Sequence, residues 1–408
     1  MKKNLTIKFH LLILISLVTI NTFAQDTWTA KANFGGIVRD QAVGFSIGTK
    51  GYIGTGFNGV VSHNQTLNDF WEYNQATDTW TQKADFGGAP RLNAVGFSIG
   101  SKGYIGTGID SLGNNLNDFW QYDPIGNTWT PKANFGGLAR SQAIGFSIGT
   151  NGYIGIGAGA SLFNDFWEYN SLTDIWTAKA NYTGLARYSS TGFAIGSKGY
   201  IGTGFDGSSS KLKEFYEYNP ATNSWTPKAN FGGTKRRNAV GFSIGNKGYI
   251  GTGADSIGFQ QDFWEYDTLS NIWTQKANFG GGNRYLATGF SIGSKGYIGT
   301  GGNPFLSGFY KDLWEYSPSS TVGILENNNG VQISISPNPS TGSFNILISE
   351  PTKNGTIEVY NNIGELVLSK TVTSQQNTID LSNQANGLYF IKAISDNKIV
   401  GSQKIVKE

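Results

Sequence analysis

The sequence contains no cysteine, and its 408 residues include only one methionine and two histidines. The absence of cysteine excludes a disulfide framework, a thiol nucleophile, a cysteine-ligated zinc site and a lipidated cysteine anchor. Charged residues make up 14% of the chain, well below the roughly one quarter of an average soluble protein. This composition argues against coiled coils, helical bundles and charged disordered segments.

The chain also lacks an excess of charge of either sign once its first residues are set aside. The formal net charge of +3 comes from 31 basic and 28 acidic residues. Lys2, Lys3 and Lys8 lie in the leader described next, and subtracting these three leaves 28 basic and 28 acidic residues. A neutral chain has no electrostatic basis for general binding to nucleic acid or to an anionic membrane.

The apolar run near the N-terminus is too short to cross a membrane. Residues 11–20 form a ten-residue apolar core, whereas a bilayer-spanning helix needs about 20 apolar residues. Basic residues precede this core, and Thr22-Phe23-Ala24 follows it with the small-x-small pattern of a cleavage site. We interpret residues 1–24 as a signal peptide, with an uncleaved anchor as the less favoured alternative, and predict that the protein is exported.

What the sequence has in abundance is glycine, and the glycines mark an internal repeat. The motif GFSIGTKGYIGTG or a close variant begins at Gly44, Gly96, Gly145, Gly192, Gly241 and Gly289. A second motif, DFWEY or a close variant, begins at Asp69, Asp118, Asp165, Glu214, Asp262 and Asp312. A third motif, WTxKA, begins at Trp28, Trp80, Trp129, Trp176, Trp225 and Trp273.

Each unit of about 50 residues has the pattern of four short antiparallel strands. In the first unit these are residues 42–47, 52–55, 70–73 and 80–83. Four strands per repeat of this length are typical of a propeller blade, and glycine suits its crowded inner strands. The predicted fold class is all-β, a β-propeller followed by a small β-sandwich.

The number of copies of each motif predicts how the ring closes. Trp28 opens a fourth strand with no blade before it, whereas residues 312–316 form a third strand with no WTxKA motif after it. The surplus strand and the missing strand match. We therefore predict a six-bladed propeller over residues 26–316, with the last blade completed by Thr27–Lys31.

These residues resemble the kelch family of β-propellers. That family has a glycine-rich second strand, a tyrosine near the end of the third and a tryptophan opening the fourth. The counterparts here are residues 51–56, Tyr73 and Trp80, and every unit repeats them. The adjacent glycine pair of the family appears as Gly54-Thr55-Gly56, which leaves the fold prediction intact but assigns no subfamily.

For residues that recur in every blade, we favour a structural role over a functional one. All eleven tryptophans occupy third- or fourth-strand positions, so none remains for a sugar-stacking platform. An arginine precedes each first strand, on the same face as the acid that begins each third strand. The favoured interpretation is a set of Arg–acid or Arg–carbonyl clamps, and the alternative is a ring of anion-binding guanidinium groups. The arginines are Arg39, Arg91, Arg140, Arg187, Arg236 and Arg284.

The chain has few residues with reactive side chains, which argues against an enzyme. We assign no catalytic residue, metal or cofactor. Kelch-like copper-radical oxidases need a Cys–Tyr cofactor and histidine ligands, whereas the mature chain has only His63. A Ser-His-Asp triad would depend on the same histidine. Carboxylates such as Glu72 recur blade after blade, as packing residues do. The six-bladed sialic-acid mutarotase remains as an enzymatic precedent, and no residue specifically supports it.

After Tyr316 the composition changes. Residues 317–332 are rich in serine and asparagine and are predicted to form a linker. Residues 333–408 contain several alternating strands, which indicate a small antiparallel β-sandwich. This segment resembles the C-terminal sorting domain of type IX secretion substrates, and an ordinary accessory β-domain is the alternative. The matching pieces are Pro337-Asn338-Pro339 and residues 364–367, 387–392 and 404–407.

Loop lengths predict where a ligand binds. The units differ in length only between the second and third strands, where Gly56 to Asp69 is 13 residues and Gly157 to Asp165 is 8. Loops that vary on a rigid scaffold usually carry recognition. The two longest belong to blades one and six, which become neighbours when the ring closes. Their candidate binding residues are Phe57, His63, Phe305, Phe309 and Tyr310, in addition to the six arginines.

The sequence therefore predicts a secreted or surface-attached propeller that binds a glycan or protein ligand. The resemblance to sorting domains implies the type IX secretion machinery as a partner. We expect a monomer with no transmembrane segment, no cofactor and no nucleic-acid partner. A carbohydrate-active enzyme similar to the mutarotase and a purely architectural surface protein are the alternatives.

Overall fold

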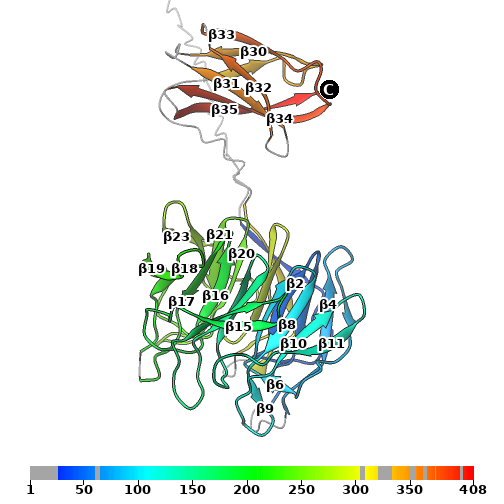
Figure 1. The fold of residues 1–408 in the computed structure, drawn as a ribbon. Helices are drawn as coiled ribbons and strands as arrows, with labels where there is room; N and C mark the ends of the chain where they lie inside the picture. The colour runs from blue at the N-terminus through cyan, green and yellow to red at the C-terminus, as the bar shows by residue number, and fades with distance from the viewer. Residues whose placement is uncertain are drawn as a thin grey trace, which may run out of the picture. The chain divides into compact units, whose positions relative to one another are not determined.

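The computed structural model describes residues 26–59, 65–208, 210–303, 308–319, 333–349, 355–361, 365–372, 374–395 and 398–408. These residues form two compact units, one within Gln25–Pro318 and one within Ser319–Glu408 (Figure 1). The predicted signal peptide and positions 320–332 of the predicted linker lie outside the described residues.

The first unit is built from six four-stranded antiparallel sheets, which confirms the predicted propeller (Figure 1). Blade one consists of β2 (Val43–Ile47), β3 (Lys50–Gly54), β4 (Phe70–Asn74) and β5 (Thr79–Gln82). Blade two consists of β7 (Val95–Ile99), β8 (Lys102–Gly106), β10 (Phe119–Asp123) and β11 (Thr128–Lys132). Blade three consists of β12 (Ile144–Ile148), β13 (Asn151–Gly155), β14 (Phe166–Asn170) and β15 (Ile175–Lys179).

The next two blades repeat the same order of strands. Blade four consists of β16 (Thr191–Ile195), β17 (Lys198–Gly202), β18 (Phe215–Asn219) and β19 (Ser224–Lys228). Blade five consists of β20 (Val240–Ile244), β21 (Lys247–Gly251), β22 (Phe263–Asp267) and β23 (Ile272–Lys276). Two short ladders lie outside the blades, β6 (Arg91–Leu92) with β9 (Ile109–Asp110) and β26 (Gly302–Asn303) with β27 (Gly308–Phe309).

Blade six is completed from the other end of the chain. Its inner strands are β24 (Thr288–Ile292), β25 (Lys295–Gly299) and β28 (Leu313–Ser317), and its outermost strand is β1 (Thr27–Lys31). β1 pairs antiparallel with β28 and places Trp28 opposite Tyr316. This pairing confirms the closure that the number of motifs predicts.

Glycine in the second strands makes room for the neighbouring blade. A Cβ atom added at Gly103 would lie 2.5 Å from the ring of Phe45 in blade one, closer than real side-chain atoms approach. The inner strands of neighbouring blades contact one another around the axis. The glycine-rich motif therefore belongs to the packing between blades.

The hydrophobic core lies between the blades and is largely aromatic. The Trp129 ring of blade two contacts Phe70 of blade one edge to face, with centroids 5.0 Å apart. Tyr122 of blade two meets the same Phe70 at 4.9 Å. Edge-to-face pairs of this kind stabilise a core beyond the burial of their area. The repeated tryptophans therefore have the structural role that the sequence predicts.

The second unit is a β-sandwich. One sheet contains β29 (Ile333–Ser336), β30 (Ser343–Ile348) and β33 (Gln376–Asp380). The other contains β32 (Leu366–Thr371), β31 (Thr356–Tyr360), β34 (Gly387–Ser395) and β35 (Lys398–Lys407). Alternating residues of both sheets, such as Phe344 and Ile391, form one buried core. The predicted fold class is therefore confirmed for both units.

Candidate binding site

The six repeated arginines are buried within the blades, and all have 0% exposure. In blade one, the two terminal nitrogens of Arg39 donate to the two carboxylate oxygens of Asp69, each at 2.6 Å. Arg39 Nη1 also donates to the Thr55 carbonyl oxygen at 2.8 Å, and its guanidinium lies 4.7 Å from the centre of the Phe34 ring. The equivalent bidentate pairs are Arg91–Asp118, Arg140–Asp165, Arg236–Asp262 and Arg284–Asp312.

This geometry is that of a structural clamp. Asp69 also accepts the indole N–H of Trp71 at 2.8 Å, so one carboxylate joins the segment before the first strand to the third strand. Blade four departs from the pattern, because Arg187 makes one bond to Glu214, at 3.2 Å. A ligand anion could reach these buried guanidinium groups only by displacing their half-buried acidic partners, and breaking such a pair is costly.

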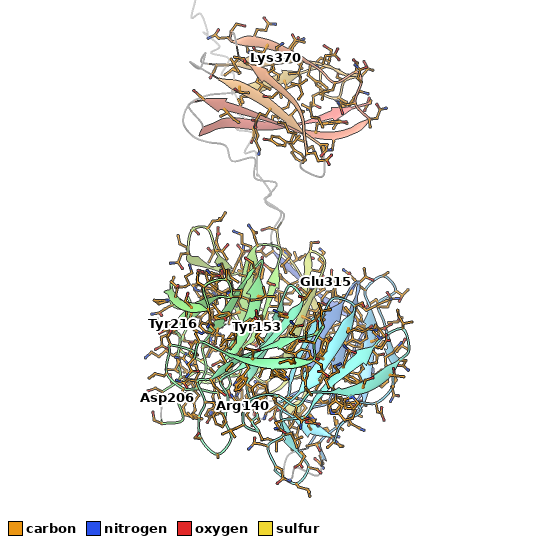
Figure 2. All side chains as sticks on the ribbon, in the orientation of Figure 1. Arg140, Tyr153, Asp206, Tyr216, Glu315 and Lys370 are labelled. Atoms are coloured by element: carbon orange, nitrogen blue, oxygen red, sulfur yellow. The ribbon has the colours of Figure 1, made fainter. Side chains whose placement is uncertain are left out.

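The unequal loops and the segments that follow the arginines share one face of the propeller. Figure 2 shows the clamp residue Arg140 and the loop residue Asp206 toward the same end. On this face, the residue after each clamp arginine pairs with a loop residue, as Asp40 does with Phe57 through backbone bonds of 3.0 and 2.9 Å. Directly opposed residues of such a pair project their side chains to the same side.

We call these paired positions, three in each blade, the rim. In blades one, two and three they are Asp40, Phe57 and Thr66; Leu92, Ile109 and Asn115; and Ser141, Ala158 and Leu162. In blades four, five and six they are Tyr188, Phe205 and Lys211; Arg237, Ala254 and Phe259; and Tyr285, Gly302 and Phe309.

The two longest loops meet at the junction of blades one and six, which we call the seam. The rings of Phe57 and Phe309 contact edge to face with centroids 6.2 Å apart. The backbone N–H of Arg39 donates to the Tyr310 carbonyl oxygen at 3.2 Å. Three of the candidate binding residues therefore lie together at the seam, whereas His63 and Phe305 lie outside the described residues.

The binding residues predicted from the sequence do not include three polar residues of the rim. Asp40, Tyr285 and Arg237 occupy the same position in blades one, six and five, directly after a clamp arginine. Burial raises the pKa of the Tyr285 phenol, the charge of Asp40 raises it further and that of Arg237 lowers it. The signal in the sequence is a departure from repetition, because this position reads Asp, Leu, Ser, Tyr, Arg and Tyr along the six units.

The charged members of this cluster differ in their surroundings. Asp40 is 2% exposed and accepts a hydrogen bond of 2.9 Å from the Gln41 amide, and its burial raises its pKa to about 6. The Arg237 guanidinium lies 5.0 Å from the centre of the Phe205 ring, and its Nε has no hydrogen-bond partner among the described residues. Within the described residues, Arg237 is also the one arginine that has no carboxylate partner.

Aromatic side chains occupy the rim of blades four, five, six and one. Phe259 and Tyr285 stack with centroids 4.5 Å apart and planes 16° apart, and Tyr188 meets Phe205 edge to face at 5.5 Å. The rim residues of blades two and three include no aromatic side chain. We call the half-buried aromatic residues the aromatic crescent, which consists of Tyr188, Phe205, Phe259, Tyr285, Phe309 and Phe57.

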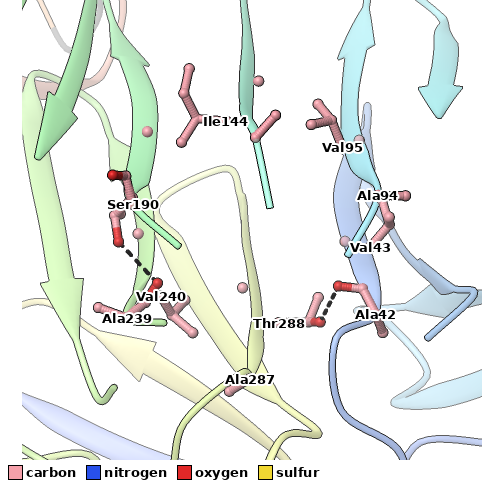
Figure 3. Close-up of a pocket in the computed structure, with 18 residues that line it drawn as sticks. Ala42, Val43, Ala94, Val95, Ile144, Ser190, Ala239, Val240, Ala287 and Thr288 are labelled. Atoms are coloured by element: carbon pink, nitrogen blue, oxygen red, sulfur yellow. Dashed lines mark hydrogen bonds between the residues drawn. The ribbon is translucent and has the colours of Figure 1, made fainter. Parts of the chain in front are cut away.

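The central channel opens beside the rim. Its mouth is a cavity of about 130 Å³. A second cavity of about 170 Å³ lies deeper and is lined mostly by small and aliphatic residues at the start of the first strands, together with Ser190, Thr191 and Thr288 (Figure 3). A closed ring of backbone hydrogen bonds of 2.9–3.2 Å joins the six mouth residues, each donating to the blade before it. These residues are Gln41, Asn93, Gln142, Ser189, Asn238 and Leu286.

The channel is uncharged. None of the described residues lining these two cavities, or a third of about 200 Å³ at the other end, is ionisable. Its polar groups are largely used internally, as when the Thr288 hydroxyl donates to the Ala42 carbonyl oxygen at 2.9 Å (Figure 3). The channel therefore offers no acid–base pair for catalysis.

Comparisons with known proteins match both units. Residues 103–136 match the model of the kelch motif, and residues 334–408 match that of the secretion system C-terminal sorting domain. Over 86 residues, 21% of this chain, the sequence is 38% identical to N-acetylneuraminate epimerase of Pasteurella multocida (strain Pm70), and the match spans 22% of that protein. The solved structure of YjhT matches with a TM-score of 0.59 and 15% identity over 69% of this chain and 95% of that one, which shows the fold alone.

The fold and the matched segments define the class of protein, a kelch-type six-bladed β-propeller with a C-terminal sorting domain. The protein is accordingly a substrate of type IX secretion that is released from the cell or attached to its outer surface. No helix within the described ranges is long and apolar enough to cross a membrane. The same ranges contain no group of three or more His, Cys, Asp or Glu side chains that could hold a metal ion.

Proposed function

We propose that the propeller is a binding module that takes a glycan or protein ligand outside the cell, on the rim face at the seam. The observation that carries this proposal is the meeting of the two longest loops, where Phe57 and Phe309 approach to 6.2 Å. Both rings are half-buried, so each keeps exposed surface for a partner. Aromatic anchors of this kind supply much of the binding energy in known interfaces.

The scaffold beneath the seam is suited to holding a binding surface in place. Clamps such as Arg39–Asp69, with two bonds of 2.6 Å, tie the segments that support the loops to the blades. Loops of unequal length on such a support can differ in recognition without disturbing the fold. A preorganised surface also loses less conformational entropy when it binds.

The double variant Phe57→Ala/Phe309→Ala tests this proposal. We expect the mature full-length protein to bind a component of a glycan array or of a panel of purified surface proteins, and the variant to bind it at least about tenfold more weakly. Phe163→Ala is the matched control, because this half-buried ring lies on the same face in blade three, 4.1 Å from the Arg140 guanidinium. Full affinity in the double variant would place the site elsewhere.

A second candidate function is catalysis on an acidic sugar, and the polar rim cluster favours it. The Arg237 guanidinium lacks a carboxylate partner among the described residues, and its Nε has no hydrogen-bond partner there; a planar guanidinium of this kind can bind a sugar carboxylate. Asp40, whose pKa is raised to about 6, is poised to transfer a proton near neutral pH. The name of the epimerase relative supplies N-acetylneuraminate as the substrate to test.

Nuclear magnetic resonance exchange measurements on N-acetylneuraminate test the second candidate. We expect the protein to accelerate the interconversion of the two anomers, and Asp40→Asn to remove the acceleration while the fold persists. Phe163→Ala serves again as the control that leaves the cluster intact. An exchange rate equal to that of the sugar alone rejects this activity.

A further inference from the structure

The aromatic crescent extends well beyond the seam. Phe309 of blade six contacts Phe57 of blade one, and Tyr285 of blade six stacks on Phe259 of blade five at 4.5 Å. Arg237 of blade five covers the ring of Phe205 in blade four, 5.0 Å from its centre. These three contacts between neighbouring blades link rim side chains across blades four, five, six and one.

Hydrogen-bonding side chains accompany these rings. Arg237 belongs to the same rim, and the half-buried amides of Gln41 and Asn238 line the mouth of the channel. Guanidinium and amide groups are planar and can form two parallel hydrogen bonds with adjacent hydroxyls. The crescent therefore alternates apolar ring surface with planar polar groups.

That combination matches the chemistry of a carbohydrate. The C–H faces of a pyranose ring pack against aromatic rings, while its hydroxyls need planar donors and acceptors at the edge. An extended peptide that binds by adding a strand would instead need an open strand edge with unpaired backbone groups. The rim ladders close that edge, because Tyr188 and Phe205 exchange both backbone bonds at 3.1 and 2.9 Å, as Asp40 and Phe57 do.

We infer that the crescent binds an oligosaccharide of several sugar units laid along blades four, five, six and one. This inference rests on the proposed binding function and names its class of ligand. One sugar ring covers about one aromatic side chain, whereas the crescent presents six of them around the rim. A ligand that used the whole surface would therefore be a chain, and its affinity would grow with the number of units.

Titration calorimetry with oligosaccharides of graded length tests the inference. The probes are neutral glucose oligomers and acidic galacturonate oligomers, from monosaccharide to hexasaccharide, added to the mature full-length protein. We expect one series or both to bind, with affinity rising about tenfold or more from the monosaccharide to the longest chain. Phe205→Ala and Phe259→Ala should each weaken the longest chain about tenfold while leaving the shortest nearly unchanged.

Ile109→Ala and Leu162→Ala are the matched controls, because these residues hold rim positions in blades two and three. They should leave the affinity for every chain length unchanged, and circular dichroism should show that all four variants stay folded. Binding of neither series, equal affinity for all lengths, or equal losses in the controls would overturn the inference. If a protein ligand depended on Phe57 and Phe309 and neither oligomer series bound, the binding function would stand and the oligosaccharide would be rejected.

Discussion

Removing the N-terminal strand should destabilise the closed propeller, because β1 supplies the outer strand of blade six from the other end of the chain. Trp28 makes much of the side-chain contact between β1 and the rest of the propeller. Its ring centroid lies 4.9–5.0 Å from those of Phe263, Phe279 and Tyr316. Its indole N–H also donates to the Ala277 carbonyl oxygen at 3.1 Å.

The magnitude follows from this environment. Truncating a buried tryptophan to alanine costs about 3–5 kcal/mol, and Trp28 is half-buried, so we expect Trp28→Ala to lower the free energy of unfolding by about 3 kcal/mol. In a domain of this size the melting temperature should fall by about 6–12 °C. Deleting residues 26–32 should cost more, because the backbone pairing of β28 is lost as well.

Trp129→Ala is the matched control for the assay. Its ring meets Phe70 and Phe86, both at 5.0 Å, but its strand lies within the chain rather than at its end. Both substitutions should lower the melting temperature similarly, whereas hydrogen exchange in Leu313–Ser317 should accelerate only when Trp28 is replaced. An unchanged melting temperature for Trp28→Ala, or unchanged exchange in β28 after the deletion, would refute the closure.

Three further predictions concern the clamps, the export and the pH dependence. Arg91→Ala should destabilise the protein by about 3 kcal/mol in urea unfolding, because Asp118 loses both its bonds of 2.6 Å; Arg187→Ala, which breaks a single bond of 3.2 Å to an acid, should cost less. Removing residues 333–408 should leave a folded propeller in the periplasm, and its appearance outside the cell would contradict the sorting role. Burial raises the pKa of Asp40 to about 6 from its ordinary value of 3.8, so folding takes up a proton between these values and stability declines as the pH rises through them. Asp40→Asn should therefore gain on the order of 2–3 kcal/mol relative to the native protein between pH 4 and pH 7, and parallel stability curves for the two proteins would contradict the buried carboxyl.

The periodicity of the sequence is sufficient to predict the architecture of the propeller. Each blade repeats the same alternation of residues, and the unmatched strand at Trp28 is sufficient to predict both six blades and their closure. The pairing of Arg39 with Asp69 can also be predicted from the sequence. Arg39 precedes the first strand and Asp69 begins the third strand, so both lie at the same face of the propeller, two strand spacings apart. Because these features recur at fixed offsets, they can be predicted without knowing how the loops fold.

Which side chains meet on the rim could not be predicted from the repeats. Phe259 stacks on Tyr285, and Arg237 covers Phe205, but these pairs join different blades through loops of unequal length that have no period. The buried state of Asp40 and its raised pKa depend in the same way on how neighbouring segments fold over it. A repeating sequence specifies the contacts that every blade makes, whereas contacts made once, where loops from two blades converge, depend on the three-dimensional path of each loop.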